Sequence, residues 1–283
     1  MHTKENMYFL VSWYRWITAR SWLHVWNTHV FKLVLRGLGV LNSEGPVATG
    51  EAWFIRQLAA SGQVRTVVDV GANTDVFGVV ELPNAKIYAI EPHPKTARKL
   101  RAIVKKNGFK QVQVHELAIG VRAGTMQLWD FAADADKKHL QPTSTLSSLS
   151  KEVIEELHGQ TAQSFSVKVD TLDRLTKQLK IEYIDVLKID TEGFELAVLQ
   201  GAKRLLKQQK IRVIQFEFNE MNVYTRTFLK DFIEVIPGYV FFRLLPNGLF
   251  PLGPYRPVTH ELFGFQNIVV LREGDPLIAY LLQ

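Results

Sequence analysis

Acidic residues follow two short apolar runs whose composition is typical of buried β-strands. The first run contains Asp69 and leads into Gly71 and Asn73, and the next run ends at Glu91. A glycine in such a turn lets the backbone approach a ligand without a Cβ in the way. A carboxylate at the end of the second strand can accept hydrogen bonds from both hydroxyls of a ribose. Together these residues predict a nucleoside-binding site.

The spacing of the first turn separates two classes of nucleoside cofactor. A dinucleotide site needs the glycines of G-x-G-x-x-G to clear a path for pyrophosphate, but Gly71, Asn73 and Val76 occupy those positions here. An acidic residue just before the turn is instead typical of sites for S-adenosylmethionine, because its sulfonium and ammonium groups are cationic. An ordinary strand-to-helix turn capped by Asn73 is the alternative on this stretch alone.

A second acidic group, Asp190, Glu192 and Glu195, lies at the end of the strand predicted at 184–190. Carboxylates near a helix N-terminus are stabilising in any protein. Capping therefore accounts for one or two of them, and Glu195 is predicted to be a solvated helix residue. Capping does not explain why these carboxylates lie at the same sheet edge as Glu91. We expect Asp190 and Glu91 to converge on one cavity.

Strands and helices alternate around both acidic groups, which predicts an α/β fold with a mostly parallel sheet and helices on both faces. A brief helical stretch is expected after Asn73, and longer helices are expected at 193–206 and 228–236. The β-branched and apolar runs predict strands at 66–70, 86–91, 111–118, 126–131, 164–169, 184–190, 212–218, 239–245 and 266–271.

Six stretches of the sequence together resemble the FkbM-type methyltransferases over about residues 65–272: VVDVGAN, AIEPHP, ELAIG, TLDRL, LKIDTEGFELAVLQGA and IQFEFN. The resemblance implies a Rossmann-like class I methyltransferase fold, S-adenosylmethionine as methyl donor, and O-methylation of a sugar, glycan or secondary-metabolite hydroxyl. It places residues at the methionine end of the cofactor (Asp69, Gly71, Asn73), at the ribose (Glu91), at the adenine (Ala118, Ile119) and facing the methyl group or substrate (Asp190).

Composition also divides the chain. Residues 1–62 are expected to form a helical, aromatic and basic extension and residues 63–283 the methyltransferase domain, with 219–262 as an insertion on the acceptor side. One departure from the family lies in the first turn, where Asp75 stands at the position of a second glycine and only about ten residues separate Asn73 from the next loop. Crowding of the cofactor's carboxylate end by this side chain would leave a non-catalytic relative with the same fold.

A hydroxyl acceptor must lose its proton to a carboxylate or histidine, or have its pKa lowered by a metal ion. Asp190 is the first candidate base, and His260 is the second, although a lone loop histidine is more often a surface residue. Asp190, Glu217 and Asn219 end neighbouring predicted strands and offer the oxygen ligands that suit Mg²⁺.

The segment that follows the predicted strand 212–218 mixes amide, aromatic and cationic side chains. Sugar sites favour planar hydrogen-bonding groups beside rings, so Asn222, Tyr224 and Arg226 are predicted to contact a small-molecule or glycan acceptor. A polar helix start is the alternative interpretation of these residues. The sequence does not identify the acceptor.

Composition narrows the class of protein further. The 283 residues include no cysteine, which excludes disulfides and thiolate-bound metals. The net charge is +6, and residues 1–42 hold five cations against one anion, a local net of +4. The remainder is therefore nearly balanced, which argues against a broad nucleic-acid surface. Without an apolar run of roughly 18 residues or a signal-peptide pattern, a cytoplasmic enzyme is expected, with membrane association as the alternative.

Four of the six tryptophans, Trp13, Trp16, Trp22 and Trp26, lie in the extension. Tryptophan together with Arg and Lys suits a membrane interface, and the same residues are common in protein interfaces. We favour packing against the sheet domain or a homodimer contact over lipid contact. A dinucleotide-dependent oxidoreductase is a further alternative, opposed by Asn73 and by the lack of a Tyr-x-x-x-Lys pair.

Overall fold

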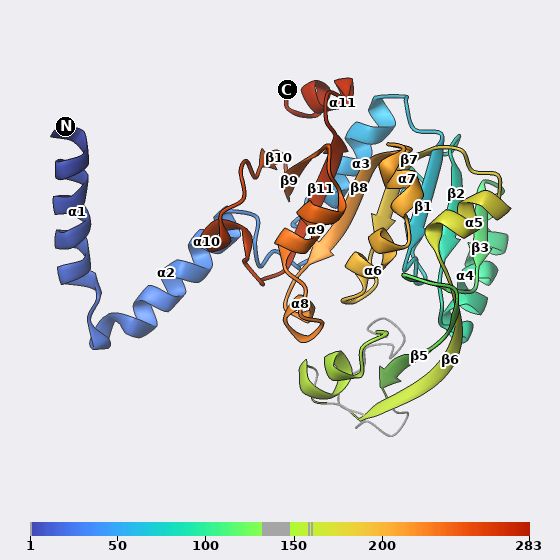
Figure 1. The fold of residues 1–283 in the computed structure, drawn as a ribbon, viewed down its shortest axis with the longest axis horizontal. Coiled ribbons are helices and arrows are strands. Elements are labelled where there is room, and N and C mark those ends of the chain that lie inside the picture. The colour runs from blue at the N-terminus through green and yellow to red at the C-terminus, as the bar shows by residue number, and fades with distance from the viewer. Residues whose placement is uncertain (1, 132–147, 158, 160) are drawn as a thin grey trace.

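The computed structural model describes residues 2–131, 148–157, 159 and 161–283 (Figure 1). An eight-stranded sheet in the order β10-β9-β11-β8-β7-β1-β2-β3 forms its centre. Its strands are β1 (Thr66–Val70), β2 (Lys86–Ile90), β3 (Val112–His115), β7 (Ile184–Ile189), β8 (Ile211–Phe218), β9 (Tyr239–Leu245), β10 (Gly248–Pro251) and β11 (Gln266–Arg272).

The neighbouring strands β3, β2, β1, β7 and β8 run parallel, whereas β11 runs antiparallel to both β8 and β9. The strand order reverses between β1 and β7, because β2 and β3 extend the sheet on one side and β8 extends it on the other. Ligands of open α/β sheets bind outside the carboxyl ends of the strands at such a reversal. The mostly parallel, Rossmann-like sheet of a class I methyltransferase is confirmed.

Helices cover both faces of the sheet because the strands are apolar on both sides. Along β1, Val68 belongs to one hydrophobic cluster and Val67 to the other, as the period of two in a strand requires. The helices on the Val68 face are α5 (Leu172–Gln178), α6 (Glu195–Gln200), α7 (Lys203–Lys207) and α9 (Leu229–Val235). Those on the Val67 face are α3 (Glu51–Ala60), α4 (Pro94–Asn107) and α11 (Pro276–Leu281).

A small second sheet lies past the carboxyl ends of the main strands (Figure 1). Its order is β4-β6-β5, with β4 at Ala118–Ile119, β6 at Ala162–Asp170 and β5 at Gly124–Phe131. The single strand predicted at 111–118 is thus two strands in different sheets. Two short helical turns, η3 (Val153–Leu157) and α8 (Met221–Tyr224), are in contact near this sheet.

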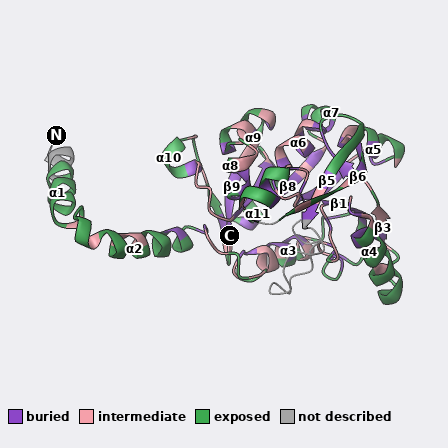
Figure 2. Ribbon diagram, turned by 90° about the horizontal axis from the view of Figure 1, so that it is seen from below, coloured by how far each residue is buried: buried purple, intermediate pink, exposed green. Residues whose placement is uncertain are grey.

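The predicted N-terminal extension forms two helices, α1 (His2–Thr18) and α2 (His24–Gly37), which project from the body of the protein (Figure 2). Among the described residues, none of the helices combines the length and the apolar character that a membrane crossing requires. In contrast, α3 packs on the sheet through Phe54, Ile55 and Leu58, which lie on one side of the helix. The extension therefore ends before α3, not at the predicted residue 62.

Three other predicted boundaries differ from the structure. The segment 219–262, predicted to be an insertion, supplies β9 and β10 of the main sheet, because β9 pairs with β11 and β10 pairs with β9 at the edge. Residues 71–85 form turns in place of the brief helix predicted after Asn73. The helix predicted at 193–206 is divided into α6 and α7 at Gly201, where a Cβ would lie 2.2 Å from the Gly120 carbonyl oxygen.

Candidate active site

A cavity opens at the carboxyl ends of β1, β2 and β7, where the strand order reverses. Its lining includes Gly71 and Asn73 after β1, Glu91 after β2 and Asp190 after β7. Its empty volume is about 630 Å³, with the space open to solvent at its mouth included. The two carboxylates predicted to converge, Glu91 and Asp190, thus line one cavity.

At Gly71, the backbone of the loop after β1 comes into close contact with the backbone at Asp190, after β7. Its φ angle is +87°, and a Cβ at this position would lie 1.7 Å from the carbonyl oxygen of Asp190. The approach is held by hydrogen bonds from the Gly71 amide to the Ile90 carbonyl (2.9 Å) and from the Asp190 amide to the Val70 carbonyl (2.8 Å). Only glycine combines this backbone conformation with this contact.

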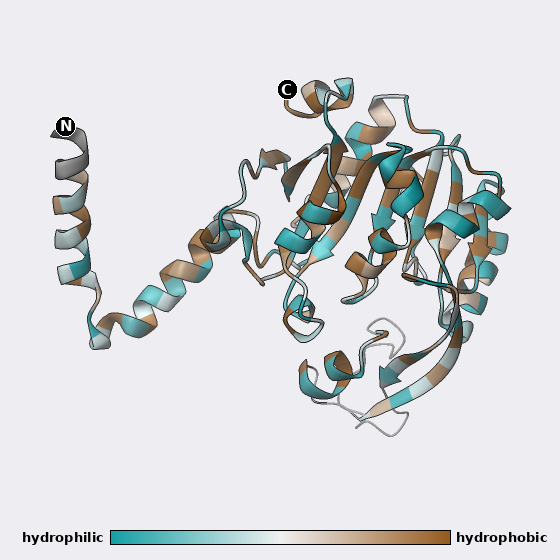
Figure 3. Ribbon diagram, in the orientation of Figure 1, coloured by the Kyte–Doolittle hydropathy of each residue, from teal (hydrophilic) through white to brown (hydrophobic). Residues whose placement is uncertain are grey.

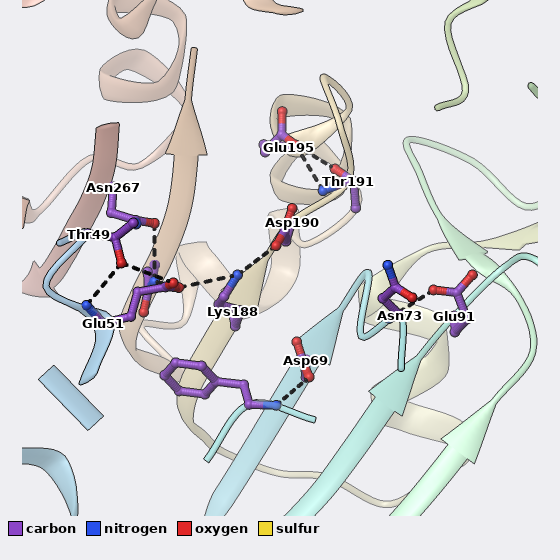
Figure 4. Close-up of polar contacts among 12 residues, drawn as sticks. Thr49, Glu51, Asp69, Asn73, Glu91, Lys188, Asp190, Thr191, Glu195 and Asn267 are labelled. Atoms are coloured by element: carbon purple, nitrogen blue, oxygen red, sulfur yellow. Dashed lines mark hydrogen bonds and ion pairs between the residues drawn. The ribbon is translucent and has the colours of Figure 1, made fainter. Parts of the chain in front are cut away.

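The Glu91 carboxylate is held by two backbone amides, and Figure 4 shows the contact with Asn73. Its Oε2 accepts a hydrogen bond from the Asn73 amide at 3.0 Å, and its Oε1 accepts one from the His93 amide at 2.7 Å. Burial raises the pKa of Glu91 to about 7, although these two hydrogen bonds lower it. Each carboxylate oxygen has a further lone pair, so the anchored group can still accept hydrogen bonds from a ligand.

Two further features of the cavity fit a nucleoside. The Asn73 Oδ1 atom is buried and has no hydrogen-bond partner among the described residues. The opposite wall is apolar and is built mainly by the second sheet and its flanking loops, with the side chains Leu117, Ala118, Ile119, Leu128 and Leu149. Ala118 and Ile119, predicted to lie against the adenine, are part of this wall. It offers a surface on which a flat base can pack.

Lys188 is a functional candidate that the sequence prediction missed. It lies buried on β7, and its Nζ is 2.9 Å from Asp190 Oδ2 and 3.6 Å from Glu51 Oε1. Glu51 Oε1 also accepts a hydrogen bond from Gln215 Nε2 at 2.6 Å, and the same amide donates to Asn267 Oδ1 at 3.2 Å. We call these five residues the Lys188 network. The sequence signal for this residue was a lysine inside the mostly apolar run 184–189, where a charged side chain must find partners.

The charges around Lys188 explain its protonation. Burial alone would lower the pKa of this lysine, but Asp190, Glu51, Glu217 and Asp69 outweigh burial and raise the pKa well above its ordinary value. The ammonium group therefore stays charged in the folded protein. The Asp190 side chain is 32% exposed, against 9% for Lys188, so the aspartate can be reached from the cavity while its cationic partner stays covered.

Asp69, predicted at the methionine end of the cofactor, lines a second cavity beside the first. The two cavities share Gly71, Asn73 and Asp190. Asp69 Oδ2 accepts a hydrogen bond from the Phe77 amide at 2.9 Å, and burial raises its pKa to about 7 against the opposing charge of Lys188. Asp75 also lines this second cavity but is exposed and does not line the first.

Glu195 is buried, so its prediction as a solvated helix residue is wrong. Its Oε1 accepts hydrogen bonds from the Thr191 amide and hydroxyl, both at 3.0 Å, and from the Gly193 amide at 3.1 Å. The carboxylate closes the loop that follows β7, where Glu192 takes a left-handed φ of +55°. Glu192 lines the cavity, and burial raises its pKa well above the ordinary value, with Asp190 adding to the shift.

The structure does not support the predicted Mg²⁺ site at Asp190, Glu217 and Asn219. Within the described ranges, no group of three or more His, Asp or Glu side chains is arranged to hold a metal ion. Asn219 Oδ1 accepts a hydrogen bond from the Met221 amide at 2.9 Å, and Asp190 pairs with Lys188. Burial raises the pKa of Glu217 well above its ordinary value, and Asp190 adds to the shift.

The predicted acceptor residues lie around α8. Asn222 is buried and serves this turn itself, because its Oδ1 accepts from the Asn219 amide (2.9 Å) and its Nδ2 donates to Thr227 Oγ1 (2.8 Å). Tyr224 is half-buried, and Arg226 is exposed with a φ of +54°. None of the three predicted residues lines either cavity, so acceptor contact by Tyr224 and Arg226 stays a prediction.

His260, the second candidate base, is buried in the short helix α10 (Pro257–His260) and is not a surface residue. Its Nδ1 accepts a hydrogen bond from the Arg256 amide at 3.2 Å, and its ring lies 5.3 Å from the Tyr255 ring. It lines neither cavity. The structure therefore places this histidine in local packing, away from the two strand-end carboxylates.

The mostly parallel sheet, with a cavity at its strand-order reversal, defines a Rossmann-like methyltransferase fold. The sequence matches the methyltransferase FkbM domain over residues 69–241, which is more than half of the chain. The protein therefore belongs to the FkbM methyltransferase family. The match spans both strand-end carboxylates and ends within β9.

Two characterised methyltransferases are similar in sequence. The 2-O-methyltransferase NoeI of Sinorhizobium fredii is 24% identical over 187 residues, covering 65% of this chain and 75% of NoeI. The methyltransferase sdnD of Sordaria araneosa is 32% identical over 154 residues, covering 48% of this chain and 59% of sdnD. The chain thus spans less than two thirds of sdnD. The fold is also similar to the crystal structure of methyltransferase FkbM from Methylobacillus flagellatus KT. The two sequences are 14% identical, the match covers 73% of this chain and 43% of that chain, and the TM-score is 0.41.

Proposed function

We propose that this protein is an S-adenosylmethionine-dependent O-methyltransferase that acts on a hydroxyl group of a sugar, glycan or other secondary metabolite. The observation that carries the proposal is the joint position of Glu91 and Asp190 on one cavity at the strand-order reversal. Membership of the FkbM family supports the reaction class. NoeI is a 2-O-methyltransferase, which supports oxygen as the methylated atom.

The residues of the cavity fit the proposed cofactor. Glu91 would accept hydrogen bonds from the ribose hydroxyls while the Asn73 and His93 amides hold it in place. The unpartnered Asn73 Oδ1 offers one more acceptor, and the apolar wall around Ile119 would cover the adenine. When bound, S-adenosylmethionine supplies a methyl group activated by its sulfonium leaving group.

Asp190 is the proposed proton acceptor for the hydroxyl of the acceptor substrate. Its carboxylate follows the carboxyl end of β7, is partly exposed and is paired with Lys188 Nζ at 2.9 Å. As the acceptor oxygen forms its new bond to carbon, its proton would pass to a carboxylate oxygen of Asp190. The protein otherwise contributes by holding the reactants in line, which is catalysis through proximity and orientation.

Calorimetry with S-adenosylmethionine and with NAD tests the cofactor. We expect binding of the first and none of the second, because the turn lacks the glycines of a dinucleotide site. Binding of neither would identify a non-catalytic relative, and binding of NAD alone would identify an oxidoreductase. Either result overturns the proposal. Mass spectrometry of glycan and polyketide acceptors incubated with the protein and S-adenosylmethionine then identifies the substrate class.

The Asp190→Asn variant tests the proton acceptor. We expect turnover to fall by ~10²–10⁴-fold, the usual contribution of a general base, with retained cofactor binding in calorimetry. Glu234→Gln is the matched control, because Glu234 is an exposed carboxylate on α9 that lines neither cavity. Equal turnover in the two variants would remove Asp190 from the chemistry.

A further inference from the structure

The two N-terminal helices carry large apolar side chains that nothing in the described chain covers. Trp13, Trp16, Trp22 and Trp26 are exposed by 57%, 68%, 78% and 57% of their surface. Figure 3 shows hydrophobic residues along both helices, which project away from the sheet domain. Monomeric soluble proteins rarely expose contiguous apolar surface of this extent, and such surface marks an interaction site. Packing of these tryptophans against the sheet domain, one of the two arrangements favoured from sequence, is thus absent, and the buried side chain of α2 is Leu35 near its end.

Both helices carry aromatic, aliphatic and cationic side chains. In α1, Phe9, Trp13 and Trp16 follow one another at spacings of four and three residues, which places them on one face, while Arg15 lies about 100° or more away around the helix from Trp16 and Trp13. In α2, Trp26 and Leu33 share a face and Lys32 lies about 100° or more from both, but Arg36 lies only about 60° from Leu33. The cations therefore flank the apolar residues, and tryptophan together with Arg and Lys is typical of segments that lie in a membrane interface.

The charge of residues 7–43 favours a lipid surface over a second copy of the chain as the binding partner of the two helices. Between Met7 and Ser43 the sequence contains four cations, Arg15, Arg20, Lys32 and Arg36, and no Asp or Glu. Arg36 is paired with Glu44, just after the segment, whereas Arg15, Arg20 and Lys32 have no ion-pair partner among the described residues. Pairing of the segment with itself would bring these three cations together without a carboxylate between them. Anionic headgroups supply the missing charge, and tryptophan is enriched at the level of lipid headgroups.

We propose that α1 and α2 bind an anionic lipid surface, with their tryptophan-bearing faces in the headgroup region and their cations against the phosphates. The linker that follows α2 connects this contact to the catalytic domain, because Gly39 and Leu41 pack against β9 and the loop before β11. The helices would therefore hold the domain at the membrane. This binding is independent of the proposed methyl transfer.

Flotation of the full chain with phosphatidylcholine vesicles, with and without phosphatidylserine, tests the proposal. We expect at least about tenfold stronger binding to the vesicles that contain phosphatidylserine, because each Lys or Arg near an anionic surface adds to the affinity. Tryptophan emission is expected to shift to shorter wavelength on binding. The Arg15→Glu/Lys32→Glu variant is expected to lose roughly tenfold or more of the binding.

Two matched variants make the test specific. Lys99→Glu/Lys105→Glu reverses two exposed charges on α4, another basic helix, and is expected to leave vesicle binding nearly unchanged. Trp13→Ser/Trp26→Ser is expected to abolish binding, whereas Val80→Ser/Phe250→Ser, which changes exposed apolar residues of the body, is expected to retain it. Calorimetry with S-adenosylmethionine on each variant checks folding separately.

Three outcomes would overturn the proposal. The first is equal loss of binding in the α4 variant, which would mean general attraction of a basic protein to anionic lipid. The second is the absence of vesicle binding by the unmodified chain. The third is a dimer in analytical ultracentrifugation that Trp13→Ser/Trp26→Ser dissociates, with no binding to vesicles, which would assign the helices to a second copy.

Discussion

The ends of β2 and β7 both present a carboxylate to the same cavity, but the two carboxylates are held in different ways. Glu91 is fixed by two backbone amides and has no cation within its hydrogen-bonding contacts. Asp190 is paired with the buried Lys188, which also contacts Glu51. One end of the cavity is thus organised by neutral dipoles and the other by an ion-pair network.

This difference suits two kinds of chemistry. Burial raises the pKa of Glu91 to about 7, although its two amide hydrogen bonds lower it. Because its described hydrogen-bond donors are amides, no cation among them competes with a ligand for this carboxylate. A buried ammonium instead pairs with Asp190, the group that we propose as proton acceptor. The amide-held end therefore fits the proposed ribose contact, and the ion-paired end fits the proposed proton transfer.

Gly71→Ala would break the connection between the two ends and is expected to have the largest effect. The new Cβ would lie 1.7 Å from the Asp190 carbonyl oxygen at a φ of +87°, so the loops after β1 and β7 must separate. The cost exceeds the roughly 1–2 kcal/mol of a left-handed alanine alone. Calorimetry is expected to detect no cofactor binding, and the free energy of unfolding is expected to fall.

Gly62→Ala is the control for backbone strain, because Gly62 has a φ of +63° and nothing within 4 Å of an added Cβ. It is expected to cost only about 1 kcal/mol of unfolding free energy and to bind cofactor normally. Similar unfolding energies for the two variants would mean that the loops adapt to a side chain at position 71.

Lys188→Met would remove the cation from the ion-paired end and is expected to have the second largest effect. Asp190, Glu51 and Glu217 would remain around a neutral side chain, and removal of one partner of a buried pair costs ~3–5 kcal/mol. Denaturant unfolding measures this loss. Glu91 is held without Lys188, so cofactor binding in the folded fraction is expected to change much less than stability.

Lys168→Met is the matched control, because Lys168 is an exposed lysine on a strand, and its loss is expected to change stability by at most about 0.5 kcal/mol. In the double variant Lys188→Met/Glu51→Gln, one of the stranded carboxylates is neutralised. A double-mutant cycle is expected to show coupling between the two positions. Additive losses would mean that Glu51 and Lys188 do not interact energetically.

The sheet and the cavity could be predicted from local sequence because each depends on short patterns. The apolar runs identified β1, β8, β9 and β11 nearly to the residue, and the acids that follow such runs must meet at one sheet edge when the strands are parallel. Gly71, Asn73, Glu91 and Asp190 were found in this way. The reason is geometric, since the ends of adjacent parallel strands have few alternative positions.

The Lys188 network and the acceptor side could not be predicted in the same way. Glu51 and Gln215 are 164 residues apart in sequence, yet they are hydrogen-bonded, and no local pattern encodes that contact. An amide such as Asn222 looks the same in sequence whether it binds a sugar or closes its own turn. Glu195 was likewise mistaken for a solvated residue, because its partners are backbone amides.

Glu91, the carboxylate held by backbone amides, is expected to make cofactor binding depend on pH. Burial raises the pKa of Glu91 to about 7, and only the ionised carboxylate accepts hydrogen bonds from both ribose hydroxyls. Affinity for S-adenosylmethionine is therefore expected to rise with pH and to be about tenfold weaker at pH 6 than at pH 8. Calorimetry across this range measures the change.

The stability of the ligand-free protein is expected to move in the opposite direction. A carboxyl whose pKa is higher in the folded state than in the unfolded state favours folding at low pH, and that contribution is lost as pH rises from about 4.5 to about 7. Denaturant unfolding with and without cofactor separates the two effects. Binding and folding thus respond to the same proton with opposite sign.

Glu91→Gln identifies the group that titrates. The variant is expected to bind the cofactor ~10–100-fold more weakly, because an amide cannot accept from both the Asn73 and His93 amides and leaves a buried donor unsatisfied. Its affinity is expected to vary little between pH 6 and pH 8, and any remaining slope would report Asp69, whose pKa is also about 7. The control Glu116→Gln loses only an exposed ion pair with Arg101 and is expected to keep the full pH dependence. An unchanged slope in Glu91→Gln would show that the amide-held carboxylate does not bind the cofactor in its ionised form.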